Sequence, residues 1–60
     1  MRSITMTSEQ TETYDGGSDE EQIALMAALR RQAQALADDT GETVEIYTAE
    51  GVVADAVYPQ

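Results

Sequence analysis

The chain has 60 residues, enough for one small domain with a marginal core. Its 12 acidic residues stand against only 3 arginines, with no lysine or histidine, so the net charge of −9 excludes direct binding of nucleic acid or of an anionic membrane. The absence of cysteine excludes disulfides and thiolate zinc sites. The partner that this charge favours is a basic macromolecule.

Residues 1–14 are predicted to form the first strand. Ile4, Met6 and Tyr14 fall on one side of the alternating pattern, and threonines, which favour strands, occupy much of the other. Few large apolar residues follow Met6, so we expect the strand to fray or bend near residues 8–10. A loop of Asp-Gly-Gly at 15–17 ends it.

Residues 18–40 are predicted to form the one helix. Ser18 and Glu21 have the spacing of a capping box, in which each side chain accepts a hydrogen bond from the other residue's backbone N–H. Gly41 suits the left-handed position that ends a helix. Apolar residues at helical spacing should pack against the sheet. They are Leu25, Met26, Leu29, Ala33, Leu36 and Ala37, with Ile23 and Arg30 at the edge of the stripe.

Residues 43–58 are predicted to form a β-hairpin around a loop at 49–51. A two-residue loop would place Asp55 opposite Ile46 on the buried face. A three-residue loop with Gly51 left-handed places Ala54 there instead, and it is preferred because it buries only apolar residues. The inner face then carries Val44, Ile46, Val52, Ala54 and Ala56. The outer face carries Glu45, Tyr47, Val53, Asp55 and Val57.

These elements predict a single small acidic domain over residues 1–60, of the α+β class. We expect a βαββ order, in which a three-stranded antiparallel sheet is covered on one face by one helix. The first strand is placed beside the last. Its placement parallel to the second strand, through a right-handed crossover, is the alternative.

No catalytic residue, cofactor site or metal site is predicted, and the chain is not expected to be an enzyme. The absence of histidine and cysteine removes most nucleophilic and zinc-binding arrangements. Carboxylates gather at 19–21 and 38–42, but without the ligand spacing of a calcium-binding loop. We interpret both groups as solvated ends of the predicted helix.

The distribution of negative charge is the feature that predicts function. The six carboxylates from Glu9 to Glu21 have no basic residue among them, and a second set surrounds the helix end and the hairpin. A rigid scaffold with spaced carboxylates, such as a row with Glu45 near Asp55, can imitate a phosphate backbone. Glu21 is set apart because capping explains it. The predicted partner-binding residues are Glu9, Glu12, Asp15, Asp19, Glu20, Asp38, Asp39, Glu42, Glu45, Tyr47, Glu50 and Asp55.

In its length, acidity, missing catalytic residues and one-helix layout, the whole chain resembles small acidic inhibitors of phages and mobile elements, including DNA mimics and anti-CRISPR proteins. The resemblance implies a non-enzymatic inhibitor in the cytoplasm of a bacterial host. It implies that the inhibitor occupies the basic surface of a nucleic-acid-binding protein or CRISPR effector complex. The segment from Leu36 to Gly51 is also similar to small bacterial proteins of unknown function with a βαββ unit, which supports the fold.

Two other interpretations fit the same sequence. The outer-face residues Tyr47, Val53 and Val57 would suit an interaction or assembly module that forms a homodimer. The acidity would alternatively serve solubility or a salty cytoplasm. Binding that weakens steeply with salt would indicate the inhibitor, whereas salt-resistant self-association would indicate the module. With no membrane-spanning stretch or signal-peptide pattern, a soluble cytoplasmic protein is expected.

Overall fold

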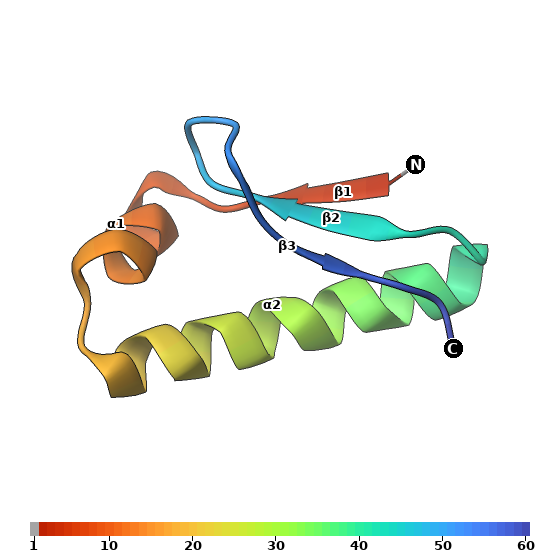
Figure 1. Cartoon of the computed structure of the whole chain (residues 1–60), viewed down its shortest axis with the longest axis horizontal. Helices are drawn as coiled ribbons and strands as arrows, with labels where there is room; N and C mark the ends of the chain where they lie inside the picture. The colour runs from red at the N-terminus through yellow and green to blue at the C-terminus, as the bar shows by residue number, and fades with distance from the viewer. Residues whose placement is uncertain (1) are drawn as a thin grey trace.

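The computed structural model describes residues 2–60, in which a three-stranded sheet lies on one long helix (Figure 1). The elements in chain order are β1 (Arg2–Thr5), α1 (Ser8–Gly16), α2 (Asp19–Thr40), β2 (Val44–Tyr47) and β3 (Val53–Val57). The molecule is α+β, but the predicted βαββ order with one helix is wrong because α1 follows β1. Within residues 2–60, no helix is both long and apolar enough to cross a membrane.

Local signals set both ends of α2. The Ser18 hydroxyl accepts a hydrogen bond from the Glu21 N–H at 3.3 Å, and the Glu21 carboxylate accepts one from the Ser18 N–H at 3.1 Å. Hydrogen bonding from the Ser18 backbone, and then from the Ser18 side chain, holds the pKa of the Glu21 carboxyl below its ordinary value. At the other end, Gly41 is left-handed with φ 71°, and its N–H donates to the Ala37 carbonyl.

The structure of residues 6–16 contradicts the predicted strand over residues 1–14. The strand ends at Thr5, and α1 begins with a second capping box. The Gln10 N–H donates to the Thr7 hydroxyl at 3.1 Å, and the Thr7 N–H donates to the Gln10 side chain at 2.9 Å. These two hydrogen bonds satisfy N–H groups that the first turn of a helix would otherwise leave unpaired. The threonine-rich segment therefore forms a helix and not a strand.

The sheet is mixed, with strand order β1-β2-β3. The predicted fully antiparallel sheet, with the first strand beside the last, is therefore wrong. β1 lies parallel to β2, pairing Ile4 with Ile46, while β2 and β3 form the expected antiparallel hairpin. α1 lies at the end of the sheet where β1 finishes, and α2 carries the chain back to the end where β1 starts, so that β2 runs in the direction of β1 (Figure 1).

The hairpin register also differs from the prediction. Gly51 is left-handed with φ 87°, as expected, but Ile46 pairs with Asp55 and Val44 with Val57, because an irregularity between Ile46 and Tyr47 shifts β3. Val57 therefore enters the core in place of Ala56, which buries more apolar surface. The predicted inner residue Val52 is 61% exposed.

The core lies between the sheet and the upper face of α2. Ala33 and Ala37 on α2 are fully buried in it, and Ile46 and Val44 on β2 are the largest fully buried side chains of the same cluster. The stripe predicted on the helix packs here, except that Ile23 is exposed. The buried hydrophobic residues are Met6, Leu29, Ala33, Ala37, Val44, Ile46 and Val57.

Candidate functional site

Arginines neutralise some of the predicted partner-binding carboxylates within the chain. The Arg30 Nε lies 2.7 Å from an Asp55 oxygen, and the Arg2 Nε lies 3.4 Å from a Glu42 oxygen. Asp55 also accepts a hydrogen bond from the Ala56 N–H at 2.8 Å. Asp55 and Glu42 therefore have structural roles within the chain, which do not require binding to another molecule.

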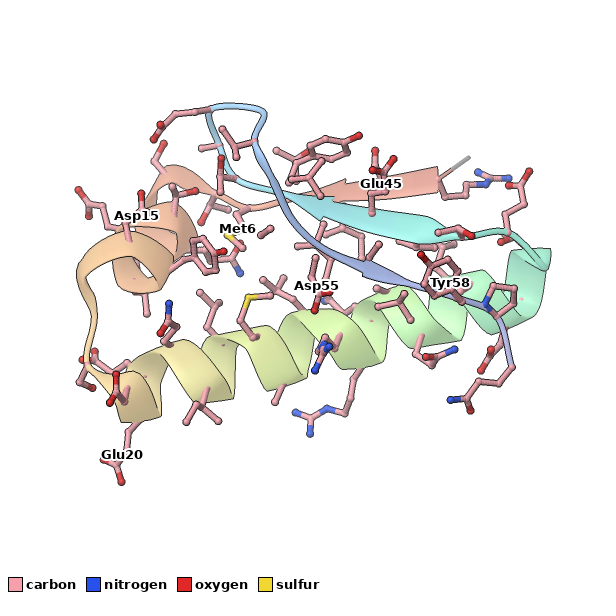
Figure 2. All side chains as sticks on the ribbon, viewed as in Figure 1. Met6, Asp15, Glu20, Glu45, Asp55 and Tyr58 are labelled. Atoms are coloured by element: carbon pink, nitrogen blue, oxygen red, sulfur yellow. The ribbon has the colours of Figure 1, made fainter. Side chains whose placement is uncertain are left out.

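Glu45 and Asp55 do not form the predicted acidic row. Asp55 pairs with Ile46 and so shares the helix-facing side of the sheet, whereas Glu45 points away from α2 (Figure 2). The Tyr47 hydroxyl donates to the Glu45 carboxylate at 3.1 Å. This hydrogen bond raises the pKa of Tyr47 above its ordinary value, because loss of the proton would leave two negative charges side by side.

Asp38 fastens the C-terminal segment to α2. Its Oδ1 accepts hydrogen bonds from the Gln60 N–H and from the Gln34 side chain, each at 2.9 Å. The same Gln34 amide donates to the Tyr58 carbonyl at 2.9 Å. The bond from the Gln60 backbone, and then that from Gln34, holds the pKa of Asp38 below its ordinary value. Asp38 therefore has a structural role in the folded chain.

Acid is expected to release this segment. A carboxyl whose pKa is lowered by folding stabilises the fold above its unfolded pKa and loses that contribution as the pH falls through the folded pKa. In an NMR titration, the Gln34 side-chain amide signals, which report on the Asp38 carboxylate, should therefore shift with a midpoint below the ordinary 3.8. Asp38→Asn, which keeps an acceptor oxygen but cannot titrate, should abolish the shift. A midpoint at or above 3.8 would contradict the assignment.

The remaining predicted residues at the α1 end of the molecule have no such internal partners. We call this group the acidic end, and Figure 2 shows Asp15 and Glu20 lying there. Among the residues that the structure describes, none of these side chains makes a hydrogen bond or ion pair. The acidic end comprises Glu9, Glu12, Asp15, Asp19, Glu20 and Glu50. Asp39 lies at the opposite end of α2.

The structure adds Glu50 to a group that the sequence placed elsewhere. The loop between β2 and β3 lies beside α1, because the buried Thr11 hydroxyl accepts a hydrogen bond from the Ala49 N–H at 2.9 Å (Figure 1). Between the loop and α1 is an open groove of about 590 Å³, here called the α1–loop groove. Its lining residues are Ser8, Thr11, Glu12, Asp15, Gly16, Ala49 and Glu50.

The apolar outer face is smaller than predicted. Val57 packs into the core beside α2 and is only 9% exposed, which leaves Tyr47 paired with Val53 on the open side of the sheet. Val53 is 49% exposed. Two residues make a weak candidate for the interface of an assembly module.

No cluster of three or more potential metal ligands occurs within residues 2–60. Comparisons with protein-family models, curated proteins and solved structures found no match to this chain. The distribution of charge and the shape of the surface are therefore the features of the molecule that bear on its function.

Proposed function

We propose that the chain is a non-enzymatic, cytoplasmic binding protein that inhibits a nucleic-acid-binding protein, such as a CRISPR effector complex, by occupying its basic surface. The observation that carries the proposal is the acidic end. Its six carboxylates come from α1, α2 and the β2–β3 loop, and they have no ion-pair partner among residues 2–60.

The position of the arginines strengthens this argument. Arg2 and Arg30 lie near carboxylates outside the acidic end, at Glu42 and Asp55. Negative charge is therefore left unbalanced at one end of a molecule whose longest dimension is 33 Å. Such an end attracts a basic surface during encounter and competes with phosphate groups for its lysines and arginines.

Retention of a bacterial protein on the immobilised chain tests the proposal. Cleared lysate is applied at low salt, and retained proteins are eluted with a salt gradient and identified. A parallel resin carrying polyglutamate removes from consideration proteins that bind any polyanion. We expect a nucleic-acid-binding protein that is specific to the chain, is displaced by duplex DNA, and elutes as the Debye length falls from about 10 Å at 0.1 M to about 3 Å at 1 M salt.

A variant with six substitutions provides the control for charge. Changing every carboxylate of the acidic end to its amide should abolish retention of that protein while circular dichroism remains unchanged. Retention that survives this change would refute the proposal. Recovery of the chain alone, as a dimer indifferent to salt, would also refute it and would favour the small assembly module.

A further inference from the structure

The α1–loop groove is a preformed feature of the acidic end. On one side, Thr11 is only 4% exposed. Its hydroxyl accepts a hydrogen bond from the Ala49 N–H and donates one to the Thr7 carbonyl at 2.9 Å. On the other side, the Thr48 hydroxyl accepts hydrogen bonds from the Glu50 N–H at 3.3 Å and the Val52 N–H at 3.2 Å. Both walls are therefore fixed before a ligand arrives, which lowers the entropy cost of binding.

Negative charge faces the groove from both walls. Glu12 and Asp15 are three residues apart on α1 and so share one face of that helix, and Glu50 lies on the loop opposite. None of these three carboxylates has a hydrogen bond or ion pair with the part of the chain that the structure describes. A cation from outside the chain would complement them.

The groove also has room and apolar surface for the stem of a long side chain. A Cβ placed on Gly16 would meet no atom within 4 Å, so the space beside it is open. Ala49 contributes only a methyl group to the opposite wall. An arginine can lay its methylene stem along such surface while its planar guanidinium, with five N–H donors, contacts carboxylates on both walls. A lysine ammonium is a compact charge that spans the walls less well.

We propose that the α1–loop groove receives an arginine side chain of the partner. This inference rests on the proposed function and specifies the chemistry by which the acidic end recognises a basic protein. It separates Glu12, Asp15 and Glu50, which line the groove, from Glu9, Asp19 and Glu20, which contribute charge outside it.

An NMR titration of the whole chain with capped Gly-Xaa-Gly peptides tests the choice of ligand. The middle residue is arginine, lysine or citrulline, the last of which matches the shape of arginine without its charge. We expect the arginine peptide to shift the amide signals of Thr11, Asp15, Ala49 and Glu50 and to bind roughly tenfold more tightly than the citrulline peptide. Equal binding of arginine and citrulline, or arginine-induced shifts centred outside the groove, would overturn the proposal.

Two triple variants with the same change of charge test the site. The first is Glu12→Gln, Asp15→Asn and Glu50→Gln. The second, outside the groove, is Glu9→Gln, Asp19→Asn and Glu20→Gln. We expect the first to weaken binding of the arginine peptide on the order of tenfold and the second only about twofold, through general electrostatics.

The outcomes separate this inference from the proposed function. Equal losses in the two variants, with salt-sensitive binding of the arginine peptide to the native chain, would overturn the groove and leave the acidic end as a general basic-protein surface. Absence of binding by any basic peptide, together with no DNA-displaced protein from lysate, would overturn both. The titration of the native chain stands independently if either variant fails to fold.

Discussion

Replacing Ile46 with alanine is expected to remove a large part of the free energy of unfolding. Ile46 is fully buried between the sheet and α2, and truncating a buried isoleucine to alanine costs about 2–5 kcal/mol. A chain of 60 residues has a total stability of roughly 3–9 kcal/mol. Urea denaturation followed by circular dichroism should show the loss as a lower midpoint, or as no folded baseline at all.

Ile23→Ala is the matched control. Ile23 lies on α2 and is 68% exposed, so the same truncation removes few contacts, and alanine is the better helix former. We expect this control to change the free energy of unfolding by no more than about 0.5 kcal/mol. Similar small effects of the two substitutions would show that Ile46 does not occupy the core and would contradict the packing of the sheet on α2.

Helix α2 could be predicted because the information that defines it is local. Ser18 and Glu21 form one capping box, Gly41 supplies the left-handed end, and the apolar residues between them repeat at helical spacing. Each signal involves residues at most a few positions apart. The contacts of α2 with the rest of the molecule reinforce these preferences and do not override them.

Helix α1 was missed although its start carries the same kind of signal. Thr7 and Gln10 have the capping-box spacing that identified Ser18 and Glu21. The threonines around them favour a strand, and the short segment lacks the apolar stripe of an amphipathic helix, so its pattern predicts a strand. The contacts that hold α1 in place involve residues outside this helix. The Gln22 side chain donates a hydrogen bond to the Tyr14 carbonyl at 2.8 Å, and the Thr11 hydroxyl accepts one from the β2–β3 loop.

The alternation of polar and apolar residues does not by itself decide the register of the hairpin, because two registers bury different residues of β3. Burying Ala56 gives a regular pattern, but burying Val57 removes more apolar surface from water, and a shift near Tyr47 makes this arrangement available. Asp55 then falls on the helix-facing side. Its position on the edge strand lets the carboxylate reach the largely exposed Arg30, so no unpaired charge is buried.

The candidate site could be predicted in composition but not in arrangement. The sequence shows an excess of carboxylates, and those on α1 and at the start of α2 are close along the chain. It does not show that Asp38 binds the Gln60 backbone or that Asp55 pairs with Arg30. It also does not show that Glu50 lies beside α1, because this depends on a hydrogen bond between Thr11 and Ala49, which are 38 positions apart.

Replacing Thr11 with valine is expected to detach the β2–β3 loop from α1. Valine keeps the shape of the side chain but removes a buried hydroxyl that accepts from the Ala49 N–H and donates to the Thr7 carbonyl, both at 2.9 Å. The Ala49 N–H would then lack its partner, which costs about 1–3 kcal/mol. We expect this loss in urea denaturation, together with faster hydrogen exchange at the Ala49 amide.

Thr13→Val provides the control on the same helix. The Thr13 hydroxyl donates only to the Glu9 carbonyl one turn earlier, at 3.3 Å, so its removal disturbs no contact between α1 and the loop. The control should leave exchange at Ala49 unchanged, and it should leave binding of the arginine peptide unchanged as well. If Thr11→Val behaves in the same way, the loop is held beside α1 by other contacts. If Thr11→Val alone accelerates exchange and weakens peptide binding, one hydroxyl links the stability of this small domain to the shape of its acidic groove.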